Sequence, residues 1–140
     1  MTPAQKRQKR KKALSRKGGI LDKTWSRAVI VAADGCCAIC GIRPDRPNPH
    51  HLIRKSRGKR FRWVFDNGVC LCFTHHTGGA EAAHAGGLAF AEAFQEKYPE
   101  RAAWYSQANR DNKVLGPWKP SLEELEEIRK ELEEIIEDLS

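Results

Sequence analysis

Two short pairs of metal-binding residues constrain the fold of this 140-residue chain more than any other feature. Cys37 and Cys40 form a Cys-x-x-Cys pair, and Cys72 and His75 form a Cys-x-x-His pair, with 31 residues between the pairs. Zinc takes four tetrahedral ligands, and closed sets of Cys and His are typical of structural sites. We expect these four residues to bind one structural zinc. The alternative, four ordinary buried side chains, is disfavoured by two such pairs in one short chain.

Length and composition indicate one modest domain with polar appendages. A core of roughly 100 residues gives thin stability by itself, so a structural metal would help. There is no apolar run long enough for a membrane span, and no apolar stretch follows the basic N-terminus as in a secretory signal. We therefore expect a cytoplasmic protein with reduced cysteines, in which Cys36 and Cys70 are small buried hydrophobic residues.

Charge is segregated along the chain, although the net charge is only +7. Residues 1–19 contain eight bases and no acid, whereas residues 121–140 contain nine acids and two bases. We expect 1–19 to be a basic arm that is disordered when free, 20–118 to be the folded domain, and 119–140 to be an acidic amphipathic helix. A basic body with a basic arm points to nucleic acid as partner. For the arm alone, a solvated and solubilising tail is an equally good reading.

The apolar and turn patterns predict a small α+β fold built on a hairpin. Thr24 can cap a helix over 25–33, which leads to the first cysteine pair. Short strands over 51–54 and 69–71 flank the turn signal Asp66-Asn67-Gly68. Further helices are expected from about Thr74, over 88–97 and over 99–108.

The last segment predicts a strongly patterned helix over 121–139. Ser121 and Glu124 form a capping box after Pro120, and leucines and isoleucines make one apolar stripe. Packing of this stripe against the body is the first expectation. A homodimer or a protein partner docked on the helix is the second, and its acidic face in a basic groove is a weaker third.

Four residues inside or beside the zinc-binding span have no place in a plain zinc finger. His50 and His51 are adjacent and point to opposite sides if they lie on a strand. Asn67 lies in the turn, and His76 directly follows His75. Each alone would more often be a turn residue or a surface histidine, but together they favour a catalytic site. For His84, a surface histidine is favoured over a role at a metal or phosphate.

These motifs resemble those of the HNH endonucleases of the His-Me finger, or ββα-metal, class. The resemblance covers residues 25–80 and rests on Cys37-x-x-Cys40-Gly, His50-His51-Leu-Ile and Asn67-Gly-Val-Cys-Leu-Cys72-x-x-His75-His76. Many members have Asp-His or Glu-His where this chain has His50-His51. Many also have Cys-x-x-Cys where this chain has Cys72-x-x-His75, a change that keeps a zinc-competent ligand. The resemblance implies a hairpin-plus-helix core that is clamped by zinc and surrounded by helices.

The resemblance also implies a mechanism and site residues. His51, Asn67 and His76 would be catalytic, with His51 as the general base and Asn67 holding its ring. His50 and His76 would bind one catalytic divalent ion at the scissile phosphate, with magnesium or manganese expected and other transition metals accepted. The products would carry 5′-phosphate and 3′-hydroxyl ends.

The expected substrate is double-stranded DNA, gripped by a basic loop between His51 and Asn67. Six bases occupy this loop without an acid among them: Arg54, Lys55, Arg57, Lys59, Arg60 and Arg62. Phe61 and Trp63 could stack on bases or wedge into a groove. The alternative is that Trp63 and Phe65 pack as core beneath the loop, and this is favoured for at least one of them. Phage or prophage DNA processing in a bacterial cytoplasm is the expected setting. The rival function is a non-catalytic, zinc-bound nucleic-acid adaptor in a phage packaging or recombination assembly.

Overall fold

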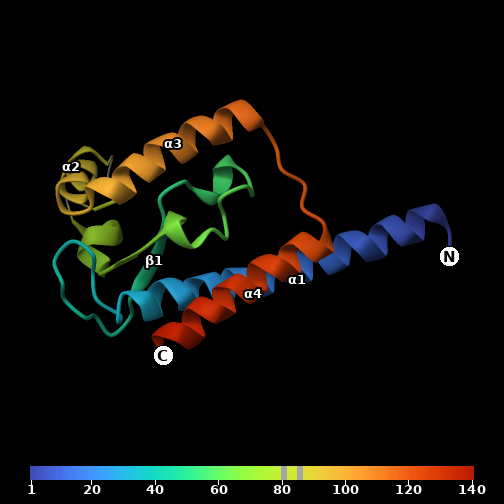
Figure 1. Ribbon diagram of the computed structural model, residues 1–140, viewed down its shortest axis with the longest axis horizontal. Coiled ribbons are helices and arrows are strands. Elements are labelled where there is room, and N and C mark those ends of the chain that lie inside the picture. The colour runs from blue at the N-terminus through green and yellow to red at the C-terminus, as the bar shows by residue number, and fades with distance from the viewer. Residues whose placement is uncertain (80–81, 85–86) are drawn as a thin grey trace.

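A computed structural model describes residues 1–79, 82–84 and 87–140 of the chain as helices around one small hairpin (Figure 1). The elements are α1 (Pro3–Ala32), β1 (Asn48–His51), the short turns η1 (Lys55–Arg57) and η2 (Phe65–Asn67), β2 (Gly68–Leu71), the π-helical turn η3 (Thr74–Gly78), α2 (Leu88–Lys97), α3 (Pro99–Leu115) and α4 (Leu122–Leu139). The expected small α+β fold is confirmed. Within the described ranges, no helix combines the length and apolar character needed to cross a membrane.

Helix α1 differs from the sequence-based expectation because it begins at Pro3 and runs without a break to Ala32. Residues 3–19, which the sequence predicts to be disordered when free, are therefore part of a helix in this structure. Thr2 and Gln5 form a capping box, and most residues that follow are good helix formers. Thr24 is not a cap, since its hydroxyl donates to the Ile20 carbonyl inside the helix. A division of the chain into three functional parts stays a prediction.

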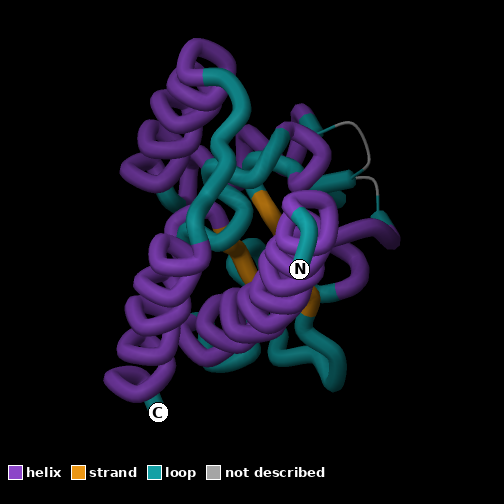
Figure 2. The backbone as a smooth tube through the Cα atoms, turned by 90° about the vertical axis from the view of Figure 1, so that its right-hand side faces the viewer, coloured by secondary structure: helices purple, strands orange, loops and turns teal. Residues whose placement is uncertain are grey.

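The hairpin lies against α1 through a glycine. Strands β1 and β2 are antiparallel, with His50 opposite Val69 and His51 opposite Gly68 (Figure 2). A Cβ atom on Gly68 would come within 2.2 Å of the Val29 side chain and 2.8 Å of the Trp25 indole. Only glycine therefore allows β2 to approach α1 this closely. Strand β1 lies earlier than the predicted 51–54, because the residues after His51 bond to the Asn67 side chain instead of extending the ladder.

Two apolar clusters hold the elements together on opposite sides of β2. Cys70 faces the cluster between α1 and α4, whereas Val69 and Leu71 face the cluster under α2. The first cluster contains Leu21, Trp25, Ala28, Val29, Trp63, Cys70, Leu125, Leu132 and Ile136. The second contains Cys37, Val69, Leu71, Cys72, Ala83, Phe90 and Phe94. Successive side chains of β2 thus point alternately into the two clusters, as expected of a strand.

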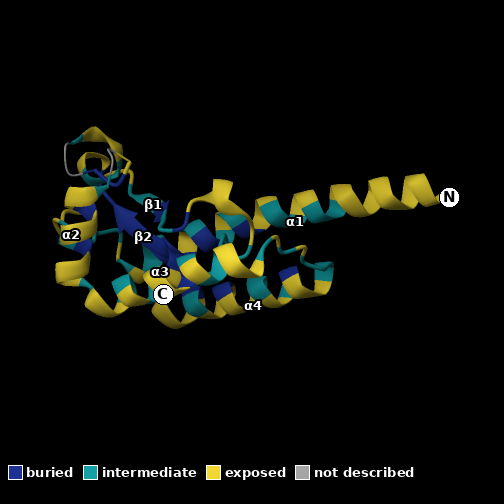
Figure 3. Ribbon diagram, turned by 90° about the horizontal axis from the view of Figure 1, so that it is seen from above, coloured by how far each residue is buried: buried dark blue, intermediate teal, exposed yellow. Residues whose placement is uncertain are grey.

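Helix α4 lies beside the C-terminal two thirds of α1 and buries its apolar stripe there (Figure 3). The capping box of Ser121 and Glu124 is formed as predicted, and Lys17 of α1 pairs with Glu126 of α4. Packing against the body, the first expectation for this helix, is confirmed. A homodimer or docked partner on α4 stays a prediction.

Candidate metal centres and cleft

The four predicted zinc ligands converge at the base of the hairpin, as the sequence predicts. The ligand atoms of Cys37, Cys40, Cys72 and His75 all lie within 4.8 Å of one another. The Cys40 and Cys72 sulfurs are 3.8 Å apart, and a tetrahedron with zinc–sulfur bonds of about 2.3 Å has edges of about 3.8 Å. His75 presents Nδ1, at 3.3 Å from the Cys72 sulfur and 3.7 Å from the Cys37 sulfur. The donor set and spacing fit one tetrahedral zinc.

The backbone around Cys37 favours a thiolate, the form in which cysteine binds zinc. Burial opposes ionisation of Cys37, but hydrogen bonds from the backbones of Cys40, Cys72 and Ile39 outweigh it and lower its pKa to about 6. Tight turning of the Cys-x-x-Cys segment directs the amides of Ile39 and Cys40 toward the sulfur, and the Cys72 amide approaches it from the end of β2. Gly41, at φ +77°, provides the left-handed residue that closes this turn.

The remaining two cysteines lie outside the four-ligand cluster. Cys70 is buried in the core between α1 and α4, and burial raises the pKa of its thiol to about 11. It is therefore a small hydrophobic residue, as the sequence suggests. Cys36 is half-buried, and its thiol contacts the Asp34 carbonyl at 3.5 Å.

A second cluster brings together His50, His76 and His84. Their ligand nitrogens lie within 4.8 Å of one another, and the Nε2 atoms of His76 and His84 are 3.0 Å apart. The rings of His76 and His84 lie edge-on to His50, at 5.3 and 4.8 Å between centroids. His84, which the sequence favours as a surface histidine, is thus at the surface and also a member of this cluster. Its ring is exposed, but its nitrogen joins the other two.

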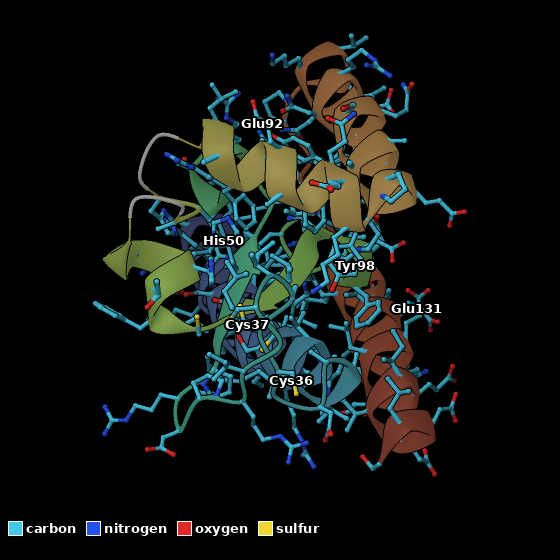
Figure 4. The ribbon with its side chains drawn as sticks, turned by 90° about the vertical axis from the view of Figure 1, so that its left-hand side faces the viewer. Cys36, Cys37, His50, Glu92, Tyr98 and Glu131 are labelled. Carbon is cyan, nitrogen blue, oxygen red and sulfur yellow. The ribbon has the colours of Figure 1, made fainter. Side chains whose placement is uncertain are left out.

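Burial and mutual proximity lower the pKa values of two histidines in this cluster. Burial, followed by the neighbouring His84 and His76, lowers the pKa of His50 to about 3. Burial and then His84 also lower the pKa of His76. Neutral imidazoles keep the lone pairs that bind metal. In Figure 4, His50 and Cys37 lie at different heights beside η3, the turn that carries both His75 and His76. Consecutive residues of one turn thus belong to the two clusters.

The ring of His51 is held on two sides. It stacks on the Trp25 indole, with centroids 3.8 Å apart and planes 11° apart. Its Nε2 lies 2.9 Å from the Arg62 carbonyl, which can only accept, so Nε2 carries the proton and Nδ1 is left with a lone pair. Burial is the main cause that lowers the pKa of His51, with Lys55 and Arg62 adding to it, so the ring is neutral near pH 7.

Asn67 holds the loop rather than the His51 ring. Its side chain is fully buried, accepts from the Ile53 amide at 2.7 Å, and donates to the carbonyls of Ile53 and Phe61 at 3.1 and 3.0 Å. These bonds occupy both amide hydrogens. The structure gives no hydrogen bond between Asn67 and His51 among those described. Instead, the Arg62 carbonyl orients the His51 ring, and Asn67 holds the loop that contains Arg62.

One cleft of about 430 Å³ is lined by four histidines: His50, His51, His76 and His84. Trp25 and Asp22 of α1 form one wall, and Arg54 and Lys55 stand exposed at its edge. The basic loop is only partly available to a substrate. Arg62 forms a bidentate pair with Asp22 at 3.0 and 2.8 Å, and Arg60 donates to the Gly116 carbonyl. Arg54, Lys55, Arg57 and Lys59 are the exposed members.

Of the two aromatic residues in the loop, Trp63 is buried in the core and Phe61 is half-buried. Trp63 is buried and donates to Asp22 at 2.8 Å, so it cannot stack on a base. Phe61 packs edge-on against Trp104, at 5.9 Å between centroids. Sequence reasoning missed Asp22 and Trp25 as parts of the cleft. No local motif marks them, because they act on residues about 25 to 40 positions further along the chain.

Comparison of the chain with protein-family models, with curated proteins and with solved structures gave no match. The site therefore rests on its own geometry: a cluster of three cysteines and one histidine, a cluster of three histidines, and one oriented histidine between the second cluster and α1.

Proposed function

We propose that this protein is a metal-dependent endonuclease of the HNH type, which hydrolyses phosphodiester bonds of DNA. One observation carries the proposal. A neutral histidine, fixed by a carbonyl and an aromatic ring, shares a basic cleft with three imidazoles that converge on one point. A purely structural zinc site would require neither His51 nor the cluster of His50, His76 and His84. The resemblance to HNH nucleases over residues 25–80 points the same way.

His51 is suited to take a proton from water. Because Nε2–H donates to the Arg62 carbonyl, Nδ1 is the nitrogen that can accept. Trp25 prevents rotation of the ring out of this orientation. Because burial lowers the pKa of His51 below its usual 6.5, the ring is largely unprotonated at pH 7 and can accept a proton from the attacking water.

His50, His76 and His84 fit a divalent cation through three imidazole nitrogens. When bound, such an ion supplies Lewis-acid stabilisation of the charge that develops on the phosphate and the leaving oxygen. Imidazole ligands favour manganese, cobalt, nickel or zinc over magnesium, which prefers oxygen. The nearest carboxylate in the cleft, Asp22, is already paired with Arg62. We therefore expect manganese to support activity better than magnesium does.

Arg54 and Lys55 would hold the phosphates beside the scissile bond. Both are exposed at the edge of the cleft that contains the histidines. Phosphate contacts of this kind give affinity without sequence information. We expect hydrolysis with little base preference and products with 5′-phosphate and 3′-hydroxyl ends.

The test uses supercoiled plasmid, the zinc-loaded protein, and manganese, magnesium or EDTA in parallel. The expected result is manganese-dependent conversion to open-circle or linear DNA that is lost in His51→Ala. Asn48→Ala on the same strand but outside the cleft is the matched control and should cut normally. Plasmid binding by the wild type without cleavage under any divalent ion would overturn the nuclease proposal in favour of the zinc-bound adaptor.

A further inference from the structure

The first turns of α1 form a free-standing basic helix. Residues 1–12 are all exposed, and α1 projects past the rest of the molecule at this end (Figure 3). We call Pro3 to Lys12 the arm. It carries six bases and no acid: Lys6, Arg7, Lys9, Arg10, Lys11 and Lys12. Contacts with the body begin at Leu14, which packs at the margin of the cluster between α1 and α4.

The arm is electrostatically unfavourable by itself. Like charges three and four residues apart on a helix repel one another. The positive end of the helix dipole lies at the N-terminus, where cations are disfavoured, and the first turn contains no acid to offset it. The arm also buries no apolar surface that would compensate. A polyanion would remove each of these costs, so the arm is complementary to a phosphate backbone.

The arm is joined rigidly to the cleft. The same helix continues to Asp22 and Trp25, which line the cleft, and Trp25 stacks on His51. At 1.5 Å per residue, Lys12 lies about 20 Å and Lys6 about 28 Å along the helix axis from Trp25. At about 3.4 Å per base pair these distances correspond to roughly six to eight base pairs of DNA.

The surface between the arm and the cleft is hollowed, and it carries Lys59 and Lys119 beside the Arg62–Asp22 pair. A cavity of about 710 Å³ runs along α1 from Leu14 to Asp22, and Asp22 also lines the histidine cleft. Lys59, Arg62 and Lys119 line its other side. A long polyanion seated in the cleft can therefore follow α1 toward the arm.

We propose that the arm is a rigid second anchor for duplex DNA, which contacts backbone phosphates roughly six to eight base pairs from the scissile bond, on one side of it. The inference rests on the proposed function for its choice of DNA. Its rigidity rests on the unbroken helix. The arm contributes affinity and sets the distance between these phosphate contacts and the scissile bond.

The first experiment measures binding alone, in the zinc-loaded His51→Ala protein so that no cutting occurs. An arm-neutral variant replaces the six arm bases with Gln, a good helix former. A control variant removes the same charge elsewhere by replacing Arg43, Arg46, Lys97, Arg110, Lys113 and Lys130 with Gln, all of which are exposed. Circular dichroism and thermal unfolding confirm that both variants fold.

The arm-neutral variant should bind a 30-base-pair duplex more weakly than the control variant. If about three of the six bases contact phosphates, its slope of log Kd against log salt should be smaller by about 3. Equal affinities and equal salt slopes for the two variants would overturn the proposal. The arm would then belong to another partner, such as an acidic protein surface.

The second experiment tests the fixed distance by ethylation interference. Because little base preference is expected, a screen of duplexes first selects one that the wild type cuts mainly at a single position. Seven helix-forming residues inserted after Lys12 add about two turns and about 10 Å. The phosphates that depend on the arm should move outward by about three base pairs. Unmoved positions would refute a rigid anchor. Failure of the nuclease proposal is seen separately, as absent cleavage by the wild type with the arm effect on binding retained.

Discussion

The imidazole of His51 lies flat on the indole of Trp25, with 3.8 Å between the ring centroids and 11° between the ring planes. The same indole donates through Nε1 to the Val64 carbonyl at 2.9 Å. Trp25 therefore contacts both the proposed general base, His51, and the loop segment that carries the Arg62 carbonyl, to which His51 donates. Helix α1 is therefore part of the site as well as part of the scaffold.

Trp25→Phe should reduce turnover without abolishing it. Loss of the Nε1 hydrogen bond and of part of the buried ring should cost about 1 to 2 kcal/mol of unfolding free energy. A less restrained His51 should lower kcat about tenfold, with little change in KM. Urea unfolding and plasmid cleavage rates measure the two effects. Trp104→Phe, a half-buried indole on α3 outside the cleft, should leave kcat unchanged; an equal loss there would show that the effect is general.

Asp22→Asn should destabilise the protein in a pH-dependent way. Burial opposes ionisation of Asp22, but hydrogen bonds from Arg62 and Trp63 outweigh it, so its pKa lies below the ordinary 3.8. The folded state therefore holds this proton less tightly than the unfolded chain. Its contribution is fully present above the unfolded pKa and is lost as pH falls through the folded pKa.

The difference in unfolding free energy between the wild type and Asp22→Asn should be about 1 kcal/mol, kept small because the pair is about a third exposed. It should be constant from pH 8 to about 5 and shrink at lower pH. Urea titrations at fixed zinc measure it, because loss of zinc in acid affects both proteins alike. A difference that grows as pH falls would contradict the assignment.

Cys72→Ser should abolish both zinc binding and stable folding. Structural zinc contributes on the order of 10 kcal/mol in small domains, which is comparable to the total stability expected of this one. Metal analysis should find one zinc per wild-type chain and none in the variant, with loss of the thermal transition. Cys36→Ser alters a cysteine outside the cluster and should keep both. Retained zinc in Cys72→Ser would show that the ligand set is wrong.

His84→Ala should raise the manganese concentration needed for half-maximal cleavage, on the order of 100-fold. Excess manganese should restore the rate, because His50 and His76 remain. The same excess should not rescue His51→Ala, which lacks the base. His84→Asp should improve activity with magnesium relative to manganese, since a carboxylate is the harder ligand. An unchanged manganese requirement in His84→Ala would exclude His84 from the site.

Gly19→Ala should stabilise the protein by about 1 kcal/mol if α1 is continuous, because alanine is the better helix former. A Cβ atom at Gly19 meets nothing within 4 Å. Gly35→Ala is the contrasting variant, since Gly35 adopts φ +71° and its replacement should destabilise. Urea unfolding distinguishes them. No gain from Gly19→Ala would indicate that α1 is broken at this point, and would weaken the rigid anchor as well.

The parts of the fold that sequence predicts are those set by neighbours in the chain. The x-x spacing of Cys37 with Cys40 and of Cys72 with His75 identified the four-residue cluster. The capping box at Ser121 and the apolar stripe placed α4, and alternation along a strand separated His50 from His51. Each signal is local, so one sequence is enough to detect it.

What sequence could not predict depends on contacts between distant segments. His84 reaches the cluster only because the chain folds back after η3, where its amide bonds to the His76 carbonyl. The ring partner of His51 is a carbonyl, which any residue could supply, so the choice of Asn67 for that role was wrong. The low apolar content of residues 1–19 and the Gly18-Gly19 pair suggested disorder, whereas the capping box at Thr2 and the continuation into a packed helix favour a helix.

The single turn η3 places His75 and His76 on successive peptide units, one in each cluster. If both clusters bind an ion, zinc at Cys37, Cys40, Cys72 and His75 would fix the turn that also carries His76, so zinc binding would favour the second site. For the proposed nuclease, a cell that withholds zinc would keep newly made chains inactive even where manganese is abundant. Zinc supply would then act as a maturation step that sets when the chain first becomes able to cut.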